Sequence, residues 1–329
     1  MNKNKINFSI IIPHKNIPEL LKRCLNSIPR REDVQIIVID DNSDPEIVNF
    51  DEFPGYNDPF VDLIFTKEGK GAGYSRNVGI KNALGKWILF TDADDFFNYC
   101  INDIFNEYYN SSADIIYFKH NCLNTYSYVT ENRSMNYNTY IDYWTFSKTR
   151  AEKLLKYEHV TPWAKIIKKK LIEENNILFD EVYVNNDVTF MYLAGFFSNN
   201  IKIDTRAIYN YTIRNNSLSY EIHKQINQLN TLKLCCKRYI FYKKNKIHIS
   251  SRNIGFMKNF IKSIINNKSY YKEALNIFNE MNITKIKIIL LCAYYLLTIP
   301  IRIINKILNG DDVLIIIHLK FLSIFKNIF

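Results

Sequence analysis

The chain has 329 residues and a mass of 39.0 kDa, with 47% hydrophobic and 23% charged residues. This is the composition of a globular protein that can bury one large core or two unequal ones, and it excludes a disordered chain. The formal net charge of +10 is unevenly spread, because residues 1–220 hold 25 Lys and Arg against 28 Asp and Glu, whereas residues 221–329 hold 18 against 5. Charge alone therefore does not indicate a nucleic-acid-binding protein.

The six cysteines form neither a C-x-x-C pair nor a zinc-like spacing, and they are too scattered for the disulfide framework of a small secreted domain. The start of the chain lacks the pattern of a signal peptide, since a short apolar run soon meets Pro13. We therefore expect a cytoplasmic protein.

Short, unbroken apolar runs alternate with helical patterns along the first 120 residues. Such runs are typical of strands that are covered on both faces of a parallel sheet. Pro18 suits a first helical turn, and Gly85 suits a helix end. The alternation predicts an α/β fold with a mostly parallel sheet. The predicted strands are Phe8–Ile12, Val34–Ile39, Val61–Phe65, Trp87–Thr91 and Asp114–Phe118, and the predicted helices are Pro18–Ile28, Ser75–Leu84 and Ile101–Tyr109.

The periodicity weakens beyond the fifth predicted strand. Residues 121–150 are rich in Asn, Thr, Tyr and Ser, which predicts irregular or edge structure, and a helical pattern resumes at Trp163–Glu174. Long helical patterns with almost no Gly or Pro follow from about Tyr220. We therefore expect an α/β domain over residues 1–220 and a basic, mostly helical region over residues 221–329.

Acidic residues follow two of the predicted strands. Asp40 and Asp41 follow the second, and Asp92 and Asp94 follow the fourth. Ligands bind beyond the carboxyl ends of strands in an open α/β sheet, and two acidic clusters at one edge repel each other unless a cation lies between them. Oxygen-preferring Mn²⁺ or Mg²⁺ fits this pattern. The alternative is a pair of solvated turns, since Asp also favours Asx-turns and helix caps.

A glycine-rich segment, Gly69–Asn77, enters the second predicted helix. It does not fit a dinucleotide-binding fingerprint, because Arg76 stands where a third small residue is needed and because the loop follows the third strand rather than the first. Its backbone N–H groups could still hold a phosphate that Lys70 and Arg76 neutralise. The alternative is an ordinary flexible loop.

Several motifs in this order resemble the family 2 glycosyltransferases with a GT-A fold, and the resemblance covers roughly residues 7–220. Any one motif would be weak alone, but their joint order and spacing are specific. The motifs are Ser9–Pro13 with Asn16, Ile39–Asp44, Gly71–Gly79 with Ser75-Arg76-Asn77, Phe90–Asp95, Trp163–Lys165 and Asn186–Phe190.

The resemblance implies a metal-dependent, inverting transfer of a sugar from a nucleotide-sugar donor to a saccharide acceptor, in which Mn²⁺ or Mg²⁺ stabilises the leaving diphosphate. It places Asp94 as the principal metal ligand, with Asp92 at the ribose or metal side, and Asp187 as the general base. The implied donor-binding residues are Pro13, Asn16, Asp40, Asp41, Lys70, Arg76 and Asp92.

The chain departs from the family pattern at one position, where Asn186 replaces the glutamate that usually precedes the base. We expect this change to affect acceptor geometry or the surroundings of Asp187 more than donor choice. Without the resemblance, Asp187 could equally be a helix N-cap. Trp163 could stack on a sugar or pack in the core, and His159 is of interest only because it lies near Trp163.

The basic last third contains two apolar stretches, residues 288–301 and 313–329. The first has 14 residues without charge, shorter than the about 20 that a helical span needs. We therefore expect peripheral contact with the cytoplasmic face of the inner membrane. The family resemblance implies a lipid-linked acceptor in surface polysaccharide synthesis, which agrees with such a contact. The rival interpretation is a helical subdomain packed on the α/β domain.

Two other functions are compatible with parts of the sequence. A non-catalytic nucleotide-sugar-binding or scaffold protein could keep the same fold. An RNA-binding protein that uses the basic region would need recognition motifs that the sequence lacks, so we expect no nucleic-acid partner.

Overall fold

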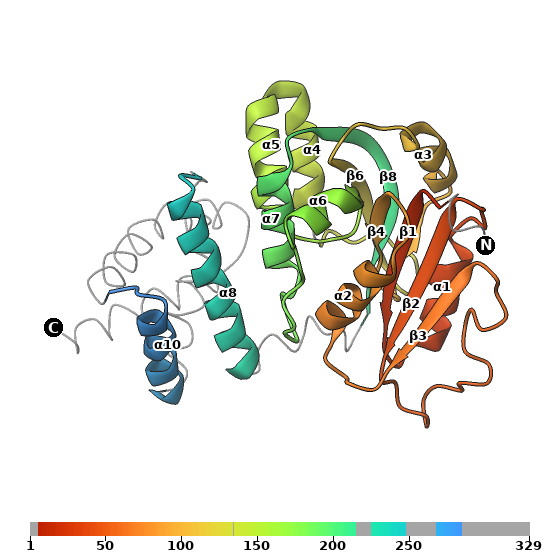
Figure 1. Ribbon diagram of the computed structural model, residues 1–329, viewed down its shortest axis with the longest axis horizontal. Coiled ribbons are helices and arrows are strands. Elements are labelled where there is room, and N and C mark those ends of the chain that lie inside the picture. Colours follow the sequence, from red (N-terminus) through yellow and green to blue (C-terminus); the bar gives the residue numbers. More distant parts are fainter. Residues whose placement is uncertain (1–5, 134, 215–224, 248–267, 285–329) are drawn as a thin grey trace. The chain divides into compact units, whose positions relative to one another are not determined.

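A computed structural model of the chain describes residues 6–133, 135–214, 225–247 and 268–284 (Figure 1). The chain divides into two compact units, Met1–Ser217 and Leu218–Phe329. The predicted boundary after residue 220 lies outside the described residues. The first unit contains the candidate site.

The first unit is built on an eight-stranded sheet in the order β3-β2-β1-β4-β7-β6-β8-β5. Neighbouring strands are parallel, except that β7 runs antiparallel to β4 and β6 and that β5 runs antiparallel to β8. The expected α/β class with a mostly parallel sheet is confirmed. The strands are β1 (Phe8–His14), β2 (Val34–Asp41), β3 (Val61–Thr66), β4 (Trp87–Phe90), β5 (Phe96–Phe97), β6 (Ile115–Asn124), β7 (Lys165–Lys168) and β8 (Ile201–Ile213).

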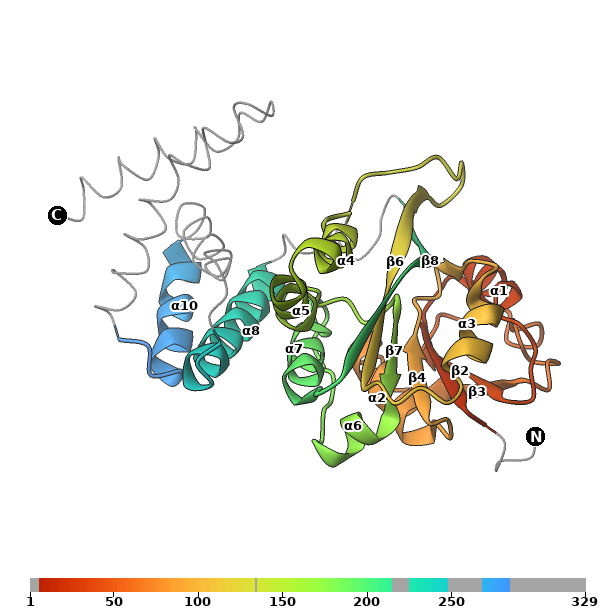
Figure 2. The same ribbon diagram turned by 90° about the horizontal axis from the view of Figure 1, so that it is seen from above.

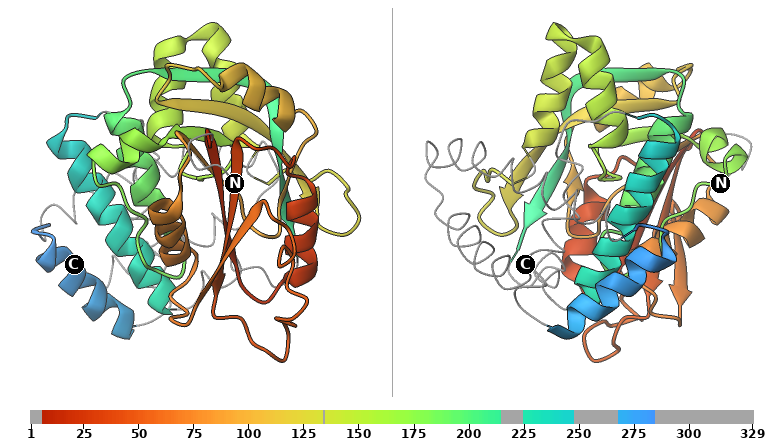
Figure 3. Two further views of the ribbon diagram at one scale, coloured as in Figure 1. Left: turned by 45° about the vertical axis from the view of Figure 1, so that its right-hand side comes forward. Right: turned by 90° about the vertical axis from the view of Figure 1, so that its left-hand side faces the viewer.

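Helices cover both faces of the sheet, and Figure 3 shows α1 and α2 on opposite sides of it. One core joins the sheet to α1 and α3, through residues such as Leu21 and Phe105. The other joins it to α2, α4, α5, α6 and α7, through residues such as Ile80 and Phe190. The helices are α1 (Pro18–Asn26), α2 (Ala72–Asn82), α3 (Ile101–Tyr108), α4 (Asn136–Phe146), α5 (Lys148–Tyr157), α6 (Lys169–Glu174) and α7 (Val188–Phe197).

Two predictions of local structure were wrong. Residues 121–150 contain the end of β6, the helix α4 and the start of α5, because buried residues such as Tyr140 and Ile141 pack on the sheet in spite of the polar composition. The helix predicted over Trp163–Glu174 is a strand followed by a short helix, β7 and α6. Ladder pairing of Ile166 and Ile167 with β6 outweighs the local helical pattern there.

The second unit contains α8 (Gln225–Lys244) and α10 (Lys268–Glu280), which pack against each other. Both helices bury apolar side chains, including Leu232 on α8 and Phe278 on α10. The two apolar stretches considered for membrane contact lie outside the described residues. Among the helices that are described, none is long and apolar enough to serve as a membrane span.

Candidate functional site

The carboxyl ends of β1, β2 and β4 meet at one edge of the sheet, because these strands are parallel neighbours. His14 at the end of β1 lies in register with Asp40 on β2, and Pro13 lies in register with Ile39. The turn that contains Asp92 and Asp94 follows β4 at the same edge. The topology therefore gathers the acidic clusters as expected for a ligand site in this class of sheet.

The Asp40 carboxylate is occupied by hydrogen bonds within the protein. One carboxylate oxygen lies 2.7 Å from Nδ1 of His14, and the other accepts the backbone N–H of Ser43 at 2.9 Å. Burial alone would raise the pKa of Asp40, but hydrogen bonds from His14 and Ser43 outweigh it and lower this pKa. Asn16, which follows β1, contacts the turn after β2, since its side-chain oxygen accepts the N–H of Asp44 at 2.8 Å. Asp40 and Asn16 thus shape the site.

Asp41 differs from Asp40 in the hydrogen bonding of its two carboxylate oxygens. Its Oδ2 accepts the backbone N–H of Gly71 at 2.8 Å, and Nζ of Lys15 lies 3.8 Å away. Its Oδ1 is buried and has no hydrogen-bond partner among the described residues. Burial raises the pKa of this carboxyl. Because buried polar atoms are nearly always paired, this oxygen points to a donor that a ligand would supply.

The backbone N–H of Gly71 is therefore occupied by Asp41. It is not available to a phosphate, contrary to the phosphate-binding interpretation of the glycine-rich loop. Gly71 adopts φ 90° at the start of α2, which glycine tolerates, and this turn aims its N–H at Asp41. The Lys70 side chain is exposed, with Nζ 4.9 Å from the ring centroid of Tyr74. The loop thus orients Asp41 through its backbone.

Asp95, the third aspartate after β4, is a structural residue. It is 1% exposed, and its two oxygens accept the Tyr209 hydroxyl and the Thr212 backbone N–H, each at 2.6 Å. Burial, together with the nearby charges of Asp94 and Asp92, raises its pKa. These bonds fasten the turn to β8.

Asp92 and Asp94 remain partly exposed, with side chains 32% and 22% accessible. Each carboxylate meets one arginine: Nη2 of Arg76 lies 2.5 Å from Asp92, and Nε of Arg214 lies 3.0 Å from Asp94. Burial and the charge of Asp92 raise the pKa of Asp94, while Arg214 opposes that rise. At this edge Asp92 and Asp94 are thus partly exposed, and each is paired with one arginine.

These residues fit a hard divalent cation only if a ligand completes its shell. Among the residues that the structure describes, no three acidic, histidine or cysteine side chains converge as a complete protein metal site would. Mg²⁺ sites commonly use one or two carboxylates together with substrate phosphates and water. Asp92 and Asp94 supply two carboxylates, and each has a second oxygen beside the one that its arginine contacts.

Arg76 connects this edge to the segment before α7. Its guanidinium, 5% exposed, donates to Asp92 through Nη2 and to the Asn186 side-chain oxygen through Nη1 at 2.7 Å. The next residue, Asn77, exchanges two hydrogen bonds with the backbone of Phe179, at 3.0 and 2.9 Å. Asn186, which replaces the expected glutamate, therefore keeps a hydrogen-bond acceptor for Arg76 but provides no charge.

Asp187 stands at the N-cap position of α7, yet its side chain makes no capping hydrogen bond. The cap interpretation thus lacks its defining interaction. Burial raises the pKa of Asp187 from 3.8 to about 6, against the opposing charge of Arg76. A carboxyl with this pKa is mostly ionised at neutral pH and can accept a proton, as a general base must.

The Trp163–Lys165 motif lies inside the unit. Trp163 is 4% exposed and stacks on Tyr209 and Tyr211, with ring centroids 5.3 and 5.4 Å apart, so it packs in the core rather than presenting a free face. His159 is 1% exposed and contacts the buried amine of Lys165. Burial lowers the pKa of both groups.

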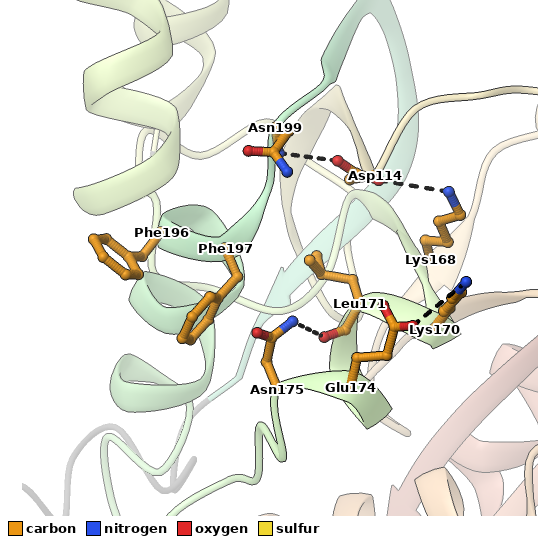
Figure 4. A pocket seen from close by; sticks show the side chains of 9 residues that line it. All are labelled: Asp114, Lys168, Lys170, Leu171, Glu174, Asn175, Phe196, Phe197 and Asn199. Carbon is orange, nitrogen blue, oxygen red and sulfur yellow. Dashed lines mark hydrogen bonds and ion pairs between the residues drawn. The ribbon is translucent and has the colours of Figure 1, made fainter.

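A surface pocket of about 430 Å³ lies away from this edge (Figure 4). Its lining includes Asp114 before β6, Lys168 at the end of the antiparallel β7 and Asn199 before β8, which places it at the amino ends of the parallel strands. Lys168 and Asp114 pair at 3.6 Å, which leaves little uncompensated charge. The clustered carboxylates lie at the opposite edge, so we assign no role to this pocket.

Sequence reasoning missed three residues of the site. Arg214 follows β8, Tyr209 lies within it, and Arg23 on α1 donates to the backbone oxygen of Asp94. No local signal marks them, because each acts on the turn after β4 from more than 70 positions away. The family motifs end at Phe190, before β8, and the sequence pattern did not predict this strand.

The fold and the site define an α/β protein whose ligand edge carries two partly exposed carboxylates and a nearby carboxyl of raised pKa. Residues 9–175 match the sequence profile of Glycosyl transferase family 2, which is about half of the chain. The chain belongs to this family, as its motifs predicted.

Individual relatives agree with this assignment. The chain is 26% identical over 223 residues to the uncharacterised glycosyltransferase EpsJ of Bacillus subtilis, covering 64% of this chain and 62% of EpsJ. It is 24% identical over 233 residues to the glycosyltransferase GlyA of Streptococcus pneumoniae, covering 64% of this chain and 31% of GlyA. The match thus spans less than two thirds of the length of either relative.

The fold is shared with a solved structure, that of residues 1–349 of TarS from Staphylococcus aureus in complex with UDP-GlcNAc. The TM-score is 0.61 at 20% sequence identity, and the similarity covers 84% of this chain and 80% of that one. The expected GT-A fold is confirmed by this likeness.

Proposed function

We propose that this protein is a metal-dependent, inverting glycosyltransferase that moves a sugar from a nucleotide-sugar donor, such as a UDP-sugar, to a hydroxyl group of a saccharide acceptor. One observation carries the proposal: Arg76 joins the partly exposed Asp92 to the segment that presents Asp187. A carboxylate pair suited to a divalent cation and a carboxyl suited to a base thereby share one edge. The likeness to TarS with bound UDP-GlcNAc supports the donor class.

On the donor side, Asp41 would bind the nucleoside, because its buried Oδ1 awaits a hydrogen-bond donor. Asp92 and Asp94 would hold Mn²⁺ or Mg²⁺ together with the donor diphosphate. The bound cation would act as a Lewis acid that stabilises the leaving diphosphate. Arg76 and Arg214 keep both carboxylates in place when no cation neutralises them.

On the acceptor side, Asp187 would take the proton of the attacking hydroxyl. With a pKa of about 6, about nine tenths of this group is ionised at pH 7. The hydroxyl oxygen then bonds to the anomeric carbon from the face opposite the departing diphosphate, and the configuration at that carbon inverts. A positioned base of this kind contributes roughly 10²–10⁴-fold to the rate.

The acceptor and the location in the cell follow from the same proposal. We infer a saccharide or lipid-linked saccharide acceptor in surface polysaccharide synthesis, reached at the cytoplasmic face of the inner membrane. The support is the basic composition of residues 221–329 and their apolar stretches. Sedimentation of the full chain with anionic liposomes, at low and at high salt, tests the membrane contact.

The direct test is release of the nucleotide diphosphate from a panel of nucleotide sugars, with Mg²⁺, with Mn²⁺ and with EDTA. We expect turnover that requires the metal and that Asp94→Asn abolishes. Asp187→Asn should keep nucleotide binding while transfer falls by about two to four orders of magnitude. The exposed Asp51 offers a matched control, Asp51→Asn, that should behave as the wild type. The proposal would be refuted if the wild-type protein turned over a donor at its full rate in EDTA, or if the Asp187→Asn variant were active.

One observation favours a second candidate, a nucleotide-sugar-binding protein without catalysis. Both exposed carboxylates of the turn are paired with arginines, and the position before the candidate base is a neutral asparagine. This candidate predicts that UDP binds in the presence of Mn²⁺ but that no nucleotide sugar is consumed. Calorimetric binding measured beside the turnover assay separates the two.

A further inference from the structure

An exposed aromatic loop, residues 124–130, follows β6 at the same carboxyl edge of the sheet. Tyr126 is 76% exposed, Tyr128 is 53% exposed and Val129 is 62% exposed. Figure 2 shows the chain extending past the end of β6 before it turns back toward α4. Large side chains that gather at the surface beside a ligand site mark a binding surface more often than isolated ones do.

Hydrogen bonds of Asn124 brace the backbone of this loop. The side-chain oxygen of Asn124 accepts the N–H groups of Tyr126 and Ser127, each at 3.1 Å, and the Asn124 N–H donates to the Val129 carbonyl oxygen at 2.8 Å. Tyr128 adopts φ 56°, a left-handed conformation that is costly for a residue with a side chain. A loop fixed in this way presents its rings with little ordering cost on binding.

Arg23 joins the loop to the candidate metal turn. Its guanidinium donates to the Thr125 carbonyl oxygen at 2.7 Å and also to the backbone oxygen of Asp94. The same guanidinium lies 4.9 Å from the ring centroid of Phe96 and 5.8 Å from that of Tyr128. The aromatic loop and Asp94 are therefore neighbours that share one arginine.

We propose that Tyr126 and Tyr128 form a stacking platform for the saccharide acceptor. This inference rests on the proposed function, because it assigns the acceptor side of the same site. A tyrosine ring offers a flat apolar face and a hydroxyl group, and it loses little conformational entropy on binding. A hexose matches it, with an apolar face of C–H groups and a rim of hydroxyl groups.

The charge of the loop favours a neutral partner. Residues 124–130 (NTYSYVT) contain no charged side chain. Contact with an anionic membrane, or with nucleic acid, would call for lysine or arginine side chains that can reach phosphates. Arg23 does lie beside the Tyr128 ring, but its guanidinium donates to the backbone oxygens of Thr125 and Asp94. Hydroxyl and amide groups alternate with the rings instead, which suits a polyhydroxylated ligand.

The test is binding of the full chain to an array of neutral oligosaccharides built from hexoses and N-acetylhexosamines. We expect the double variant Tyr126→Ala/Tyr128→Ala to lose at least tenfold in affinity. The double variant with phenylalanine at both positions should keep most of the binding, since the rings remain. Tyr56→Ala is the matched control, because Tyr56 is 62% exposed on the connection between β2 and β3. It should bind as the wild type does.

The single variant Tyr126→Ala covers the case in which the double variant does not fold, and its affinity should fall by about threefold or more. Wild-type affinity in the alanine variants, or a wild-type chain that binds no saccharide of the array, overturns the platform. The platform is also overturned if the alanine variants bind saccharides as the wild type does but no longer sediment with anionic liposomes. The loop would then be a membrane contact. Binding to the array does not depend on catalysis. If saccharide binding requires the two tyrosines but no donor is turned over, the proposed function is refuted and the platform is retained.

Discussion

Replacing Asp187 by asparagine is expected to stabilise the first compact unit as well as to remove the candidate base. The carboxyl has a pKa of about 6 in the folded chain against an ordinary value of 3.8, because burial disfavours its charged form. The folded state therefore binds this proton more tightly than the unfolded state does. Above the folded pKa the ionised carboxylate costs free energy, and the neutral amide avoids that cost.

The magnitude follows from the two pKa values. A displacement from 3.8 to about 6 corresponds to a cost of about 3 kcal/mol at pH 7 and above. The cost is about half as large at pH 5, and it disappears below the unfolded value because both states are then protonated. A gain of about 3 kcal/mol is an upper limit, since the amide is a weaker hydrogen-bond acceptor. It corresponds to a rise of up to roughly 6–12 °C in Tm for a unit of this size.

Tryptophan fluorescence can follow this unit alone, because Trp87, Trp144 and Trp163 all lie within Met1–Ser217. Urea titrations of the wild type and of Asp187→Asn, at several values between pH 5 and pH 8, give the difference in unfolding free energy. Asp51→Asn serves as the control, because it changes an exposed carboxylate. Its difference from the wild type should be small and should not grow with pH.

The result that refutes this reasoning is equally specific. If Asp187→Asn is less stable than the wild type at pH 8, the carboxylate is held by favourable interactions rather than penalised by burial. A stability difference that is independent of pH between 5 and 8 would show that the pKa of Asp187 is not raised. In either case the hypothesis that burial raises the pKa of Asp187 would have to be abandoned.

Three further variants test the architecture of the site. Arg76→Lys keeps the charge but cannot reach Asp92 and Asn186 together, so transfer should fall by about tenfold to a hundredfold in steady-state assays, and full activity would contradict the bridge. Asp95→Ala removes the acceptor of two hydrogen bonds from β8 and should lower the unfolding free energy by about 2–4 kcal/mol in urea; an unchanged midpoint would contradict that role. Gly73→Ala would place a Cβ atom 2.2 Å from a backbone carbonyl oxygen before α7, so both stability, by about 1–3 kcal/mol, and transfer should decrease. Wild-type thermal unfolding of that variant would show that the contact can relax.

Much of the first unit could be predicted from short stretches of sequence. The strands β1, β2 and β4 are rich in apolar residues and buried at every position, and α1 begins at the predicted Pro18. The sequence signal of such strands is local, because burial on both faces favours apolar residues at every position of the strand. The family resemblance added the carboxyl-edge motifs, and the structure does bring their aspartates to one edge.

The roles within each acidic cluster could not be predicted, because they depend on partners far away in the sequence. Asp40 and Asp41 are adjacent and identical in type, yet His14 and Ser43 occupy the first while one oxygen of the second is unpaired among the described residues. Asp95 is internal because Tyr209 on β8 reaches it. A local pattern contains no information about such contacts.

The sequence by itself determined the α/β class, the family and the edge of the sheet where carboxylates gather, since these follow from strand composition and motif order. Only the tertiary structure decided which carboxylate faces outward, that Arg76 ties Asp92 to the segment before Asp187, and that an aromatic loop stands beside Asp94. The physical reason is that exposure, charge pairing and pKa depend on distances between side chains, and folding sets those distances among residues that the sequence keeps far apart.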